Sequence, residues 1–285
     1  MAIVVSLINM KGGVGKTTLA SQIAHAADRK NLKVLAIDLD PQSNLSQSLL
    51  SPERYVKILK EKRPTVASLF EHYMPPTNED PHPKRVSIED VILKNAGYWH
   101  KTTLDLIPSR LELSHTLKNP TGKERRLAKE ISKISSNYDL ILLDCAPTES
   151  ILTEAAYYAS RYLLVPVKPE FLATIGLPLL GRSIQEFKYE NTDHELDICG
   201  IVFNHSSAYS DGPEGEKSLN EVKLEAKKNK WHVFDTHVRY SASYPKASRE
   251  GTPISNTSHA RWEVTYEFST FVKEFFDKIG LGDKI

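Results

Sequence analysis

This 285-residue sequence has few cysteines and almost no net charge. Its two cysteines, Cys145 and Cys199, cannot form a framework of several disulfides, which favours a reducing, cytosolic setting. The formal net charge is only +1, so bulk charge predicts neither a nucleic acid nor an anionic membrane as partner. No apolar run approaches the ~20 residues that a transmembrane helix needs. What remains is a hydrophobic content of 40%, typical of a globular domain, in a chain long enough to bury one sizeable core.

Short β-rich runs alternate with helical patterns along most of the chain. The expected strands are Ile3–Asn9, Val34–Asp38, Leu104–Ile107, Leu140–Asp144, Tyr162–Val167 and Ile198–Asn204. The expected helices are Leu19–Asp28, Glu124–Ser135, Ile151–Ala159, Leu177–Tyr189 and Arg261–Ile279. This alternation predicts an α/β fold with a mostly parallel, doubly wound sheet covered by helices on both faces, in a single domain over residues 1–285. The segment 51–100 fits least, and we interpret it as a surface excursion because of its prolines, Pro75, Pro76, Pro81 and Pro83.

The clearest motif is a glycine-rich segment between the first strand and the first helix. It reads Lys11-Gly12-Gly13-Val14-Gly15-Lys16-Thr17-Thr18, and we expect all of these residues to bind the phosphates of a nucleotide. Glycines let successive backbone N–H groups point inward at an anion, and the helix adds the positive end of its dipole. In such a P-loop Lys16 reaches the β- and γ-phosphates and Thr17 holds Mg²⁺. The strict pattern has glycine where this chain has Met10, and it does not need the second lysine, Lys11.

The run Asn9–Thr18, with its additional lysine, resembles the deviant Walker A motif of the ParA/MinD family of ATPases. The run Ile37–Gln42 resembles the Walker A′ motif of that family, and Tyr138–Pro147 resembles its Walker B strand. Weaker similarity continues to Arg239–Ile254, so the resemblance covers nearly the whole chain and is closest to the ParA-type (Soj-like) partitioning ATPases. It implies a P-loop NTPase fold, ATP and Mg²⁺ as cofactors, and hydrolysis to ADP and phosphate. It also implies an ATP-dependent homodimer in which Lys11 reaches the ATP of the other subunit.

Three aspartates follow apolar strands. Asp38 and Asp40 alternate along one strand end, so their side chains point to the same face. The resemblance implies that Asp40 positions the attacking water and that Asp38 lies nearer Mg²⁺, whereas the alternative for both is a turn or helix-capping role. A buried carboxylate such as Asp144 is costly without a cation, so Mg²⁺ is its expected partner. The expected catalytic residues are Lys11, Lys16 and Asp40, and the expected metal-binding residues are Thr17, Asp38 and Asp144.

Asn204 stands at the end of the last predicted strand. In the family that the chain resembles, the matching asparagine contacts adenine, which implies a cofactor-binding role here. Because asparagine also favours turns, a purely structural role is the alternative.

The stretch Lys217–Arg249 carries local positive charge that the whole chain lacks. It holds eight basic and three acidic residues, for a net charge of +5. In a homodimer this charge doubles across the two-fold axis, and contacts to phosphates bind DNA without sequence preference. In ParA-type members the segment after the last strand contributes to the DNA-binding face, so Arg239, Lys246 and Arg249 are the first candidates. The alternative is a solvated helix face, where most charge runs lie.

These features predict an ATP-dependent positioning ATPase. Its ATP-bound homodimer would hold nonspecific DNA, a ParB-like or other cargo-linked activator would stimulate hydrolysis, and ADP would release the DNA. The expected location is the cytoplasm, on the nucleoid, without a membrane partner. One alternative is a MinD-like membrane-surface ATPase, although the last helix, Arg261–Ile279, has a net negative charge and an apolar stripe suited to docking on the core. The other is an ATP-dependent metabolic ligase with the same deviant loop, against which the run Asp38–Gln42 argues.

Overall fold

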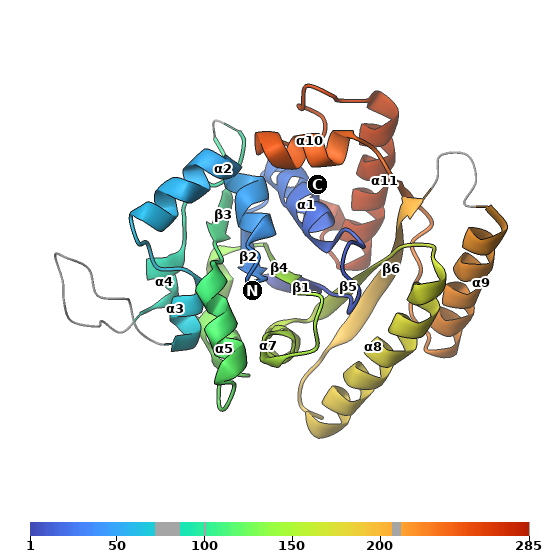
Figure 1. Cartoon of the computed structure of the whole chain (residues 1–285), viewed down its shortest axis with the longest axis horizontal. Helices are drawn as coiled ribbons and strands as arrows, with labels where there is room; N and C mark the ends of the chain where they lie inside the picture. Colours follow the sequence, from blue (N-terminus) through green and yellow to red (C-terminus); the bar gives the residue numbers. More distant parts are fainter. Residues whose placement is uncertain (72–85, 100, 207–211, 285) are drawn as a thin grey trace.

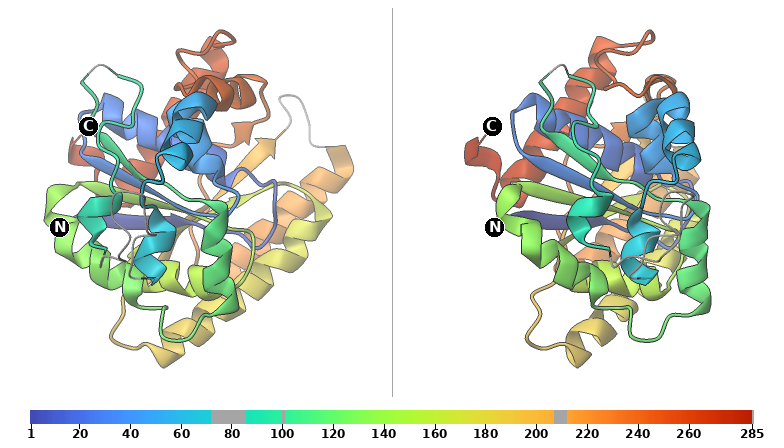
Figure 2. Two further views of the ribbon diagram at one scale, coloured as in Figure 1. Left: turned by 60° about the vertical axis from the view of Figure 1, so that its left-hand side comes forward. Right: turned by 90° about the vertical axis from the view of Figure 1, so that its left-hand side faces the viewer.

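A seven-stranded sheet forms the centre of the molecule in the computed structural model, which describes residues 1–71, 86–99, 101–206 and 212–284, apart from the side chains of residues 172–174. The strands are β1 (Ile3–Leu7), β2 (Val34–Leu39), β3 (Leu104–Ile107), β4 (Leu140–Cys145), β5 (Tyr162–Val167), β6 (Asp197–Ser206) and β7 (Val238–Arg239). Their order is β3-β2-β4-β1-β5-β6-β7, and neighbouring strands are parallel. Helices cover both faces (Figures 1 and 2), so the predicted α/β fold is confirmed.

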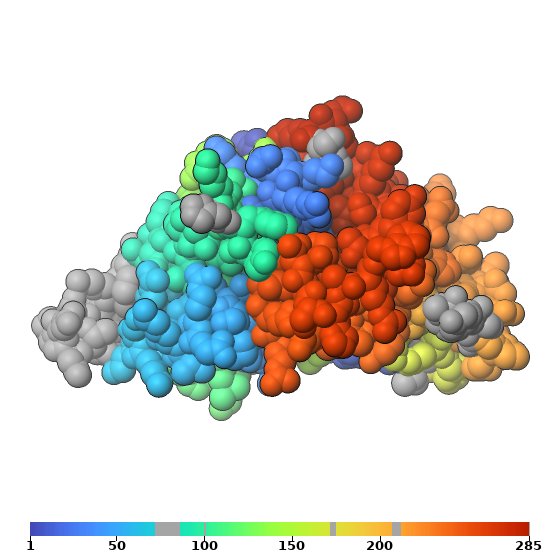
Figure 3. Space-filling model, turned by 90° about the horizontal axis from the view of Figure 1, so that it is seen from above, coloured from blue at the N-terminus to red at the C-terminus, as the bar shows by residue number. Residues whose placement is uncertain are grey.

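One face of the sheet carries four helices, drawn in the upper half of Figure 1. They are α1 (Lys16–Arg29), α2 (Asn44–Lys60), α10 (Ser243–Glu250) and α11 (Trp262–Lys278). Leu19 and Ile23 of α1 and Phe271 and Phe275 of α11 are fully buried in the core on this side. Figure 3 shows the molecule from above, with α10 in orange against α2 in light blue. The apolar stripe of the last helix therefore packs on the core, as the sequence predicted.

The opposite face is covered by α3 (Val66–Glu71), α4 (Ile88–Val91), α5 (Ser114–Lys118), α6 (Arg126–Ile134), α7 (Ile151–Ala159), α8 (Phe171–Glu190) and α9 (Gly212–Lys228). Their apolar residues form a second core cluster with the sheet, in which Phe70 and Phe203 are fully buried. Short 3₁₀ turns lie at Leu111–Leu113, Ser135–Asn137 and Gly282–Lys284. Since both faces of the sheet are covered, its strands are mostly apolar, and every residue of β4 is buried.

The predicted elements are present, most of them with shifted ends. β3, β5 and α7 have the predicted bounds, whereas α1 begins at Lys16 rather than Leu19 and α8 begins at Phe171 rather than Leu177. The sequence analysis gave no bounds for helices α2, α3, α4, α5, α9 and α10 or for strand β7. Ser51 interrupts α2 with φ 65° and ψ 155°, because the ring of the following Pro52 disfavours helical backbone at the residue before it.

Parts of the segment 51–100 belong to the core. Val66 and Phe70 of α3 and Ile88 of α4 have no exposed surface. The prolines that suggested a surface excursion all lie within residues 72–85, outside the described residues. For that part the interpretation stays a prediction.

The three sequence motifs meet at one edge of the sheet. β1 lies at its centre between β4 and β5, where the strand order reverses, and ligands of such sheets bind beyond the carboxyl ends of the strands at this point. The register places Leu7 of β1 beside Asp144 of β4. Asp38 of β2 lies on the other side of Asp144. The carboxyl ends of these strands therefore bring the P-loop and the aspartates together.

Candidate nucleotide site

A cavity of about 980 Å³ opens at this edge of the sheet. Its walls come from segments that are far apart in the chain, among them the P-loop, the loop after β2, the start of α2, the loop after β4, the end of β6, and the segment from β7 through α10. Among the motif residues that line it are Gly12, Gly13, Gly15, Lys16, Thr17, Thr18, Asp40 and Asn204. The structure thus assembles most of the predicted nucleotide site around one cleft.

The P-loop has the backbone conformation that its glycines permit. Gly13 has φ 73° and Gly15 has φ 93°, both in the left-handed region that disfavours other residues. Gly15 is also crowded, because a Cβ atom there would lie 1.9 Å from Nδ2 of Asn204. That Nδ2 donates a hydrogen bond of 2.7 Å to the carbonyl of Val14. Asn204 therefore clamps the loop from β6, and any contact to adenine stays a prediction.

Lys16 lies inside the curl of the loop. Its Nζ donates to the carbonyls of Asn9, at 2.9 Å, and Lys11, at 3.1 Å. The side chain is buried, and burial lowers the pKa of Lys16, an effect that the negative charge of Asp144 opposes. A buried ammonium held among backbone carbonyls needs a strong anionic partner, and phosphate oxygens are such a partner.

Thr17 and Asp144 form the other side of the site. Thr17 Oγ1 donates to Asp144 Oδ2 at 2.6 Å, while Asp144 Oδ1 is buried and has no hydrogen-bond partner among the described residues. Burial raises the pKa of Asp144 well above its usual value. The described residues contain no group of three His, Cys, Asp or Glu side chains that could hold a metal alone. A hydroxyl beside an unsatisfied carboxylate oxygen nevertheless fits Mg²⁺, which in such sites takes its remaining ligands from phosphates and water.

Asp38 lies in β2 and Asp40 just beyond its end, and the two carboxylates occupy different positions. Asp38 is fully buried, and its Oδ2 accepts hydrogen bonds from the N–H and the hydroxyl of Ser46, at 2.8 and 2.7 Å. Its Oδ1 accepts from the N–H of Asp40 at 3.1 Å, and burial raises the pKa of Asp38 to about 6. Asp40 lines the cleft and accepts from the N–H of Gln42. Asp38 therefore supports the loop that carries Asp40, and a role near Mg²⁺ stays a prediction.

Lys11 is paired within its own chain. Its Nζ lies 2.6 Å from Glu170 Oε2, and Nζ of Lys168 lies 2.7 Å from Glu170 Oε1. The hydrogen bond from Lys11, followed by that from Lys168, lowers the pKa of Glu170 to about 2. Glu170 stands at the N-terminus of α8, just after β5. The sequence analysis did not identify this carboxylate, because no motif connects residues so far apart in the chain.

An aromatic pair lines the cleft beyond the P-loop. The rings of His205 and Tyr240 are T-shaped, with centroids 5.8 Å apart. Tyr240 is largely exposed, so its ring is free to stack on a flat ligand group. These two residues were not identified from the sequence, and only the fold brings the ends of β6 and β7 together.

The predicted DNA-binding residues lie near one another around β7 and α10 but are not equally available. Arg239 Nε lies 2.7 Å from Glu267 Oε2 of α11. Lys246 Nζ lies 3.5 Å from Glu250 Oε1 within α10. Arg249 lines the nucleotide cleft. Two of the three positive charges are thus offset by carboxylates, and DNA binding by these residues stays a prediction.

No helix in the described parts of the chain has the length and apolar character to cross a bilayer.

Known proteins are similar in sequence to this chain along most of its length. A family model described as an AAA domain matches residues 2–198. The chain is 33% identical over 260 residues to an uncharacterized protein of Methanocaldococcus jannaschii, covering 88% of this chain and 90% of that protein. It is 30% identical over 277 residues to the chromosome-partitioning ATPase Soj of Thermus thermophilus, covering 95% of this chain and 96% of Soj.

Solved structures share the fold. Apo McdA of Cyanothece aligns with a TM-score of 0.77 and 21% identity over 97% of this chain and all of that one. Cobyrinic acid a,c-diamide synthase of Mycobacterium smegmatis aligns with a TM-score of 0.68 and 23% identity over 88% of this chain and 92% of that one. Identities this low show the fold alone. Together with the P-loop, its second lysine and the Soj relative, the family match shows that the chain belongs to the ParA/MinD-type P-loop ATPases.

Proposed function

We propose that the cleft binds ATP with Mg²⁺ and hydrolyses it, and that the ATP-bound protein is a homodimer joined by Lys11. The observation that carries the proposal is the position of Lys11, which lies at the start of the P-loop with its side chain only partly buried. An ordinary P-loop functions without this lysine, so a role beyond its own active site accounts for its presence. Membership of an ATPase family supports the hydrolytic activity.

Each residue of the cleft has a distinct part in this reaction. Lys16 and the backbone N–H groups of the P-loop bind the phosphates. When bound, Mg²⁺ neutralises charge on the phosphates, and Thr17 and Asp144 are the residues that would hold it. Asp40 orients the attacking water from the cleft wall, since phosphoryl transfer needs positioning more than a strong base. Asp38 acts behind it by fixing the backbone of Asp40.

In the proposed dimer, Lys11 leaves the carboxylate of Glu170 and binds the triphosphate of the other subunit. In the monomer its ammonium is paired with Glu170, and in the dimer it would offset charge on the triphosphate of the other subunit. Charge compensation of this kind stabilises the transition state of phosphoryl transfer and can change the rate by orders of magnitude. ATP therefore joins the subunits, and hydrolysis separates them.

The dimer would bind nonspecific DNA in its ATP form and release it as ADP forms. Arg239, Lys246 and Arg249 are the first candidates for contacts to phosphates, and a ParB-like or other cargo-linked protein would stimulate hydrolysis. The Soj relative, named as a chromosome-partitioning ATPase, supports this cycle. Binding would place the protein on the nucleoid and would weaken steeply as salt rises.

Light scattering with a non-hydrolysable ATP analogue tests the dimer. The wild type should double its mass, Lys11→Ala should stay monomeric, and Lys60→Ala, which removes an exposed lysine on α2, should behave as the wild type. A wild type that stays monomeric at saturating analogue would contradict the dimer. A separate salt series with a random duplex in ATP and in ADP tests DNA binding, and equal, salt-insensitive affinities would contradict it.

The two alternatives make different predictions. A MinD-like membrane-surface ATPase should co-sediment with anionic liposomes when ATP is present. A metabolic ligase, a class to which the structurally similar cobyrinic acid a,c-diamide synthase belongs by its name, should need a metabolite for turnover. ATP hydrolysis without any added metabolite, and without binding to liposomes, would favour the partition cycle.

A further inference from the structure

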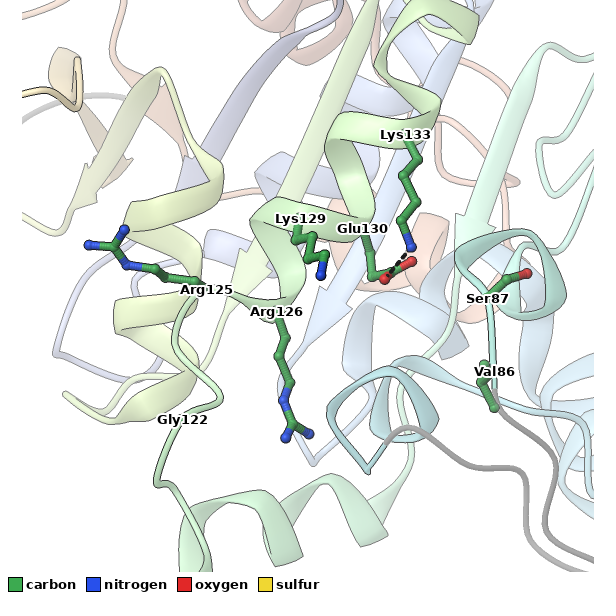
Figure 4. A pocket seen from close by; sticks show the side chains of 8 residues that line it. All are labelled: Val86, Ser87, Gly122, Arg125, Arg126, Lys129, Glu130 and Lys133. Carbon is green, nitrogen blue, oxygen red and sulfur yellow. Dashed lines mark hydrogen bonds and ion pairs between the residues drawn. The ribbon is translucent and has the colours of Figure 1, made fainter.

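A second cavity, of about 590 Å³, lies along α6 (Figure 4). Most of the cations in its lining are bonded to other groups of the protein. Lys133 is paired with Glu130, and Arg126 donates to a backbone carbonyl of α3. Arg125 turns away from the cavity and donates to Asn191 Oδ1 at 3.1 Å. This cavity therefore shows no preference for a ligand, whereas the hydrogen bonds behind the nucleotide cleft bear directly on the reaction.

Ser46 lies in the first turn of α2, a few residues after the loop that carries Asp40. Ser43, the N-cap residue of this helix, makes no capping hydrogen bond with its side chain. Asp38 of β2 caps the helix instead, because its Oδ2 accepts from the N–H of Ser46 at 2.8 Å and from the Ser46 hydroxyl at 2.7 Å. A carboxylate at this end of a helix satisfies a free N–H group and is favoured by the helix dipole.

The carboxylate of Asp38 also joins Ser46 to the loop at the cleft. Its other oxygen, Oδ1, accepts from the N–H of Asp40 at 3.1 Å. Asp40 lines the cleft, and its own Oδ1 accepts from the N–H of Gln42 at 2.9 Å. Because one planar group holds both partners, the orientation that Ser46 imposes on Asp38 also fixes the backbone of Asp40.

Ser46 is itself held from a second strand. Its Oγ accepts a hydrogen bond of 2.9 Å from the N–H of Ser109, just beyond the end of β3. The carbonyl of Ser109 in turn accepts from the hydroxyl of Tyr55 at 3.1 Å. Asp38, Ser46 and Ser109 have no exposed surface, so water cannot replace a bond that is lost. Without its hydroxyl, residue 46 would leave the N–H of Ser109 unpaired and would give Asp38 Oδ2 one donor in place of two.

We propose that Ser46 is a positioning residue of ATP hydrolysis, which acts through Asp38 to hold Asp40 where it orients the attacking water. Ser46 does not line the cleft and lies outside the three sequence motifs. Its role rests on the proposed function, because it requires that Asp40 orients the water. A displacement of about 1 Å at the reacting groups can cost on the order of 100-fold in rate. Loss of the hydroxyl should therefore slow the chemical step while the P-loop still binds the phosphates.

Steady-state ATPase kinetics on the full chain test the proposal. Ser46→Ala should lower kcat at least tenfold but leave both KM and the affinity for a fluorescent ATP analogue within twofold of the wild type. Ser46→Cys, whose thiol fills the site but forms only weak hydrogen bonds, should also lower kcat. Ser48→Ala is the matched control, because Ser48 is also buried in α2 and its hydroxyl donates to Ser21 Oγ at 3.1 Å rather than to Asp38. It should lower Tm by as much as Ser46→Ala does and keep kcat within twofold of the wild type.

Two outcomes would overturn the proposal. If Ser46→Ala or Ser46→Cys folds and hydrolyses ATP as fast as Ser48→Ala, the hydroxyl does not position Asp40. If kcat and the affinity for the analogue fall together in these variants, the substitution disturbs the whole cleft and Ser46 has a structural role alone. A wild type that does not hydrolyse ATP would instead contradict the proposed function itself, so the two failures can be told apart.

Discussion

The ion pair between Lys11 and Glu170 opposes dimerisation if Lys11 has to reach the other subunit. Glu170→Gln removes the carboxylate, keeps the size of the side chain, and frees both Lys11 and Lys168. The side chain of Glu170 is 44% exposed and that of Lys11 is 24% exposed, so solvent screens the pair and it contributes about 0.5–1 kcal/mol. A dimer breaks two such pairs, one in each subunit. The variant should therefore dimerise more favourably by about 1–2 kcal/mol, which is about 5- to 30-fold in the dissociation constant.

Sedimentation velocity over a dilution series, with a non-hydrolysable ATP analogue, measures this constant. Glu186→Gln is the matched control, because Glu186 pairs with Arg182 at 2.8 Å farther along the same helix. It should leave the constant unchanged. The effect should also shrink as salt rises, since both members of the pair are partly exposed. An unchanged or weaker dimer in Glu170→Gln, with a normal control, would refute the argument that this carboxylate holds Lys11 back.

Three further predictions follow from other contacts. Gly15→Ala should abolish binding of a fluorescent ATP analogue, because the added methyl group meets Asn204 and the residue has φ 93°; Gly176→Ala, which meets no atom within 4 Å, is the control. Burial lowers the pKa of His25 to about 4, and neither ring nitrogen has a partner among the described residues. The pKa of His25 is about 6.5 in the unfolded chain. At pH values between this and the folded pKa, the unfolded chain binds a proton that the folded chain does not. The free energy of unfolding should therefore fall by up to about 3 kcal/mol as the pH falls through this range. Urea unfolding at pH 7 and pH 4.5 should show a smaller loss of unfolding free energy for His25→Leu than for the wild type, and an equal loss would contradict the role of His25. The raised pKa of Asp38 acts in the opposite direction, but Asp38 is present in both proteins and its effect cancels in the comparison. Glu267→Gln should free Arg239 and raise the affinity of the ATP form for duplex DNA several-fold. The slope of log affinity against log salt concentration should become steeper by about one released ion. An unchanged slope would show that Arg239 does not contact DNA.

Much of the cleft could be predicted because its chemistry is local. The P-loop occupies consecutive residues, and its positive φ angles at Gly13 and Gly15 require glycine wherever the loop occurs. The aspartates could be placed because parallel strands end at one edge of the sheet, so Asp38 and Asp144 were expected near the P-loop. The strands themselves were visible as short apolar runs, since both faces of the sheet are buried.

The charge analysis shows where such reasoning fails. Residues 217 to 249 carry an excess of positive charge, but two of these cations are offset by carboxylates outside that stretch. Arg239 pairs with Glu267 on α11, and Lys246 pairs with Glu250, one residue beyond the end of the stretch. Composition along the chain cannot report which charges meet in space.

By itself the sequence determined the fold class, the phosphate-binding loop and the identity of its two lysines, because each depends on residues close together in the chain. Only the tertiary structure decided that Lys11 is held by Glu170, that Asn204 binds the carbonyl of Val14 in the P-loop, and that Arg239 is paired with Glu267. These contacts join residues on separate strands and helices. Their formation depends on how the elements pack, and packing leaves no periodic signal in the sequence.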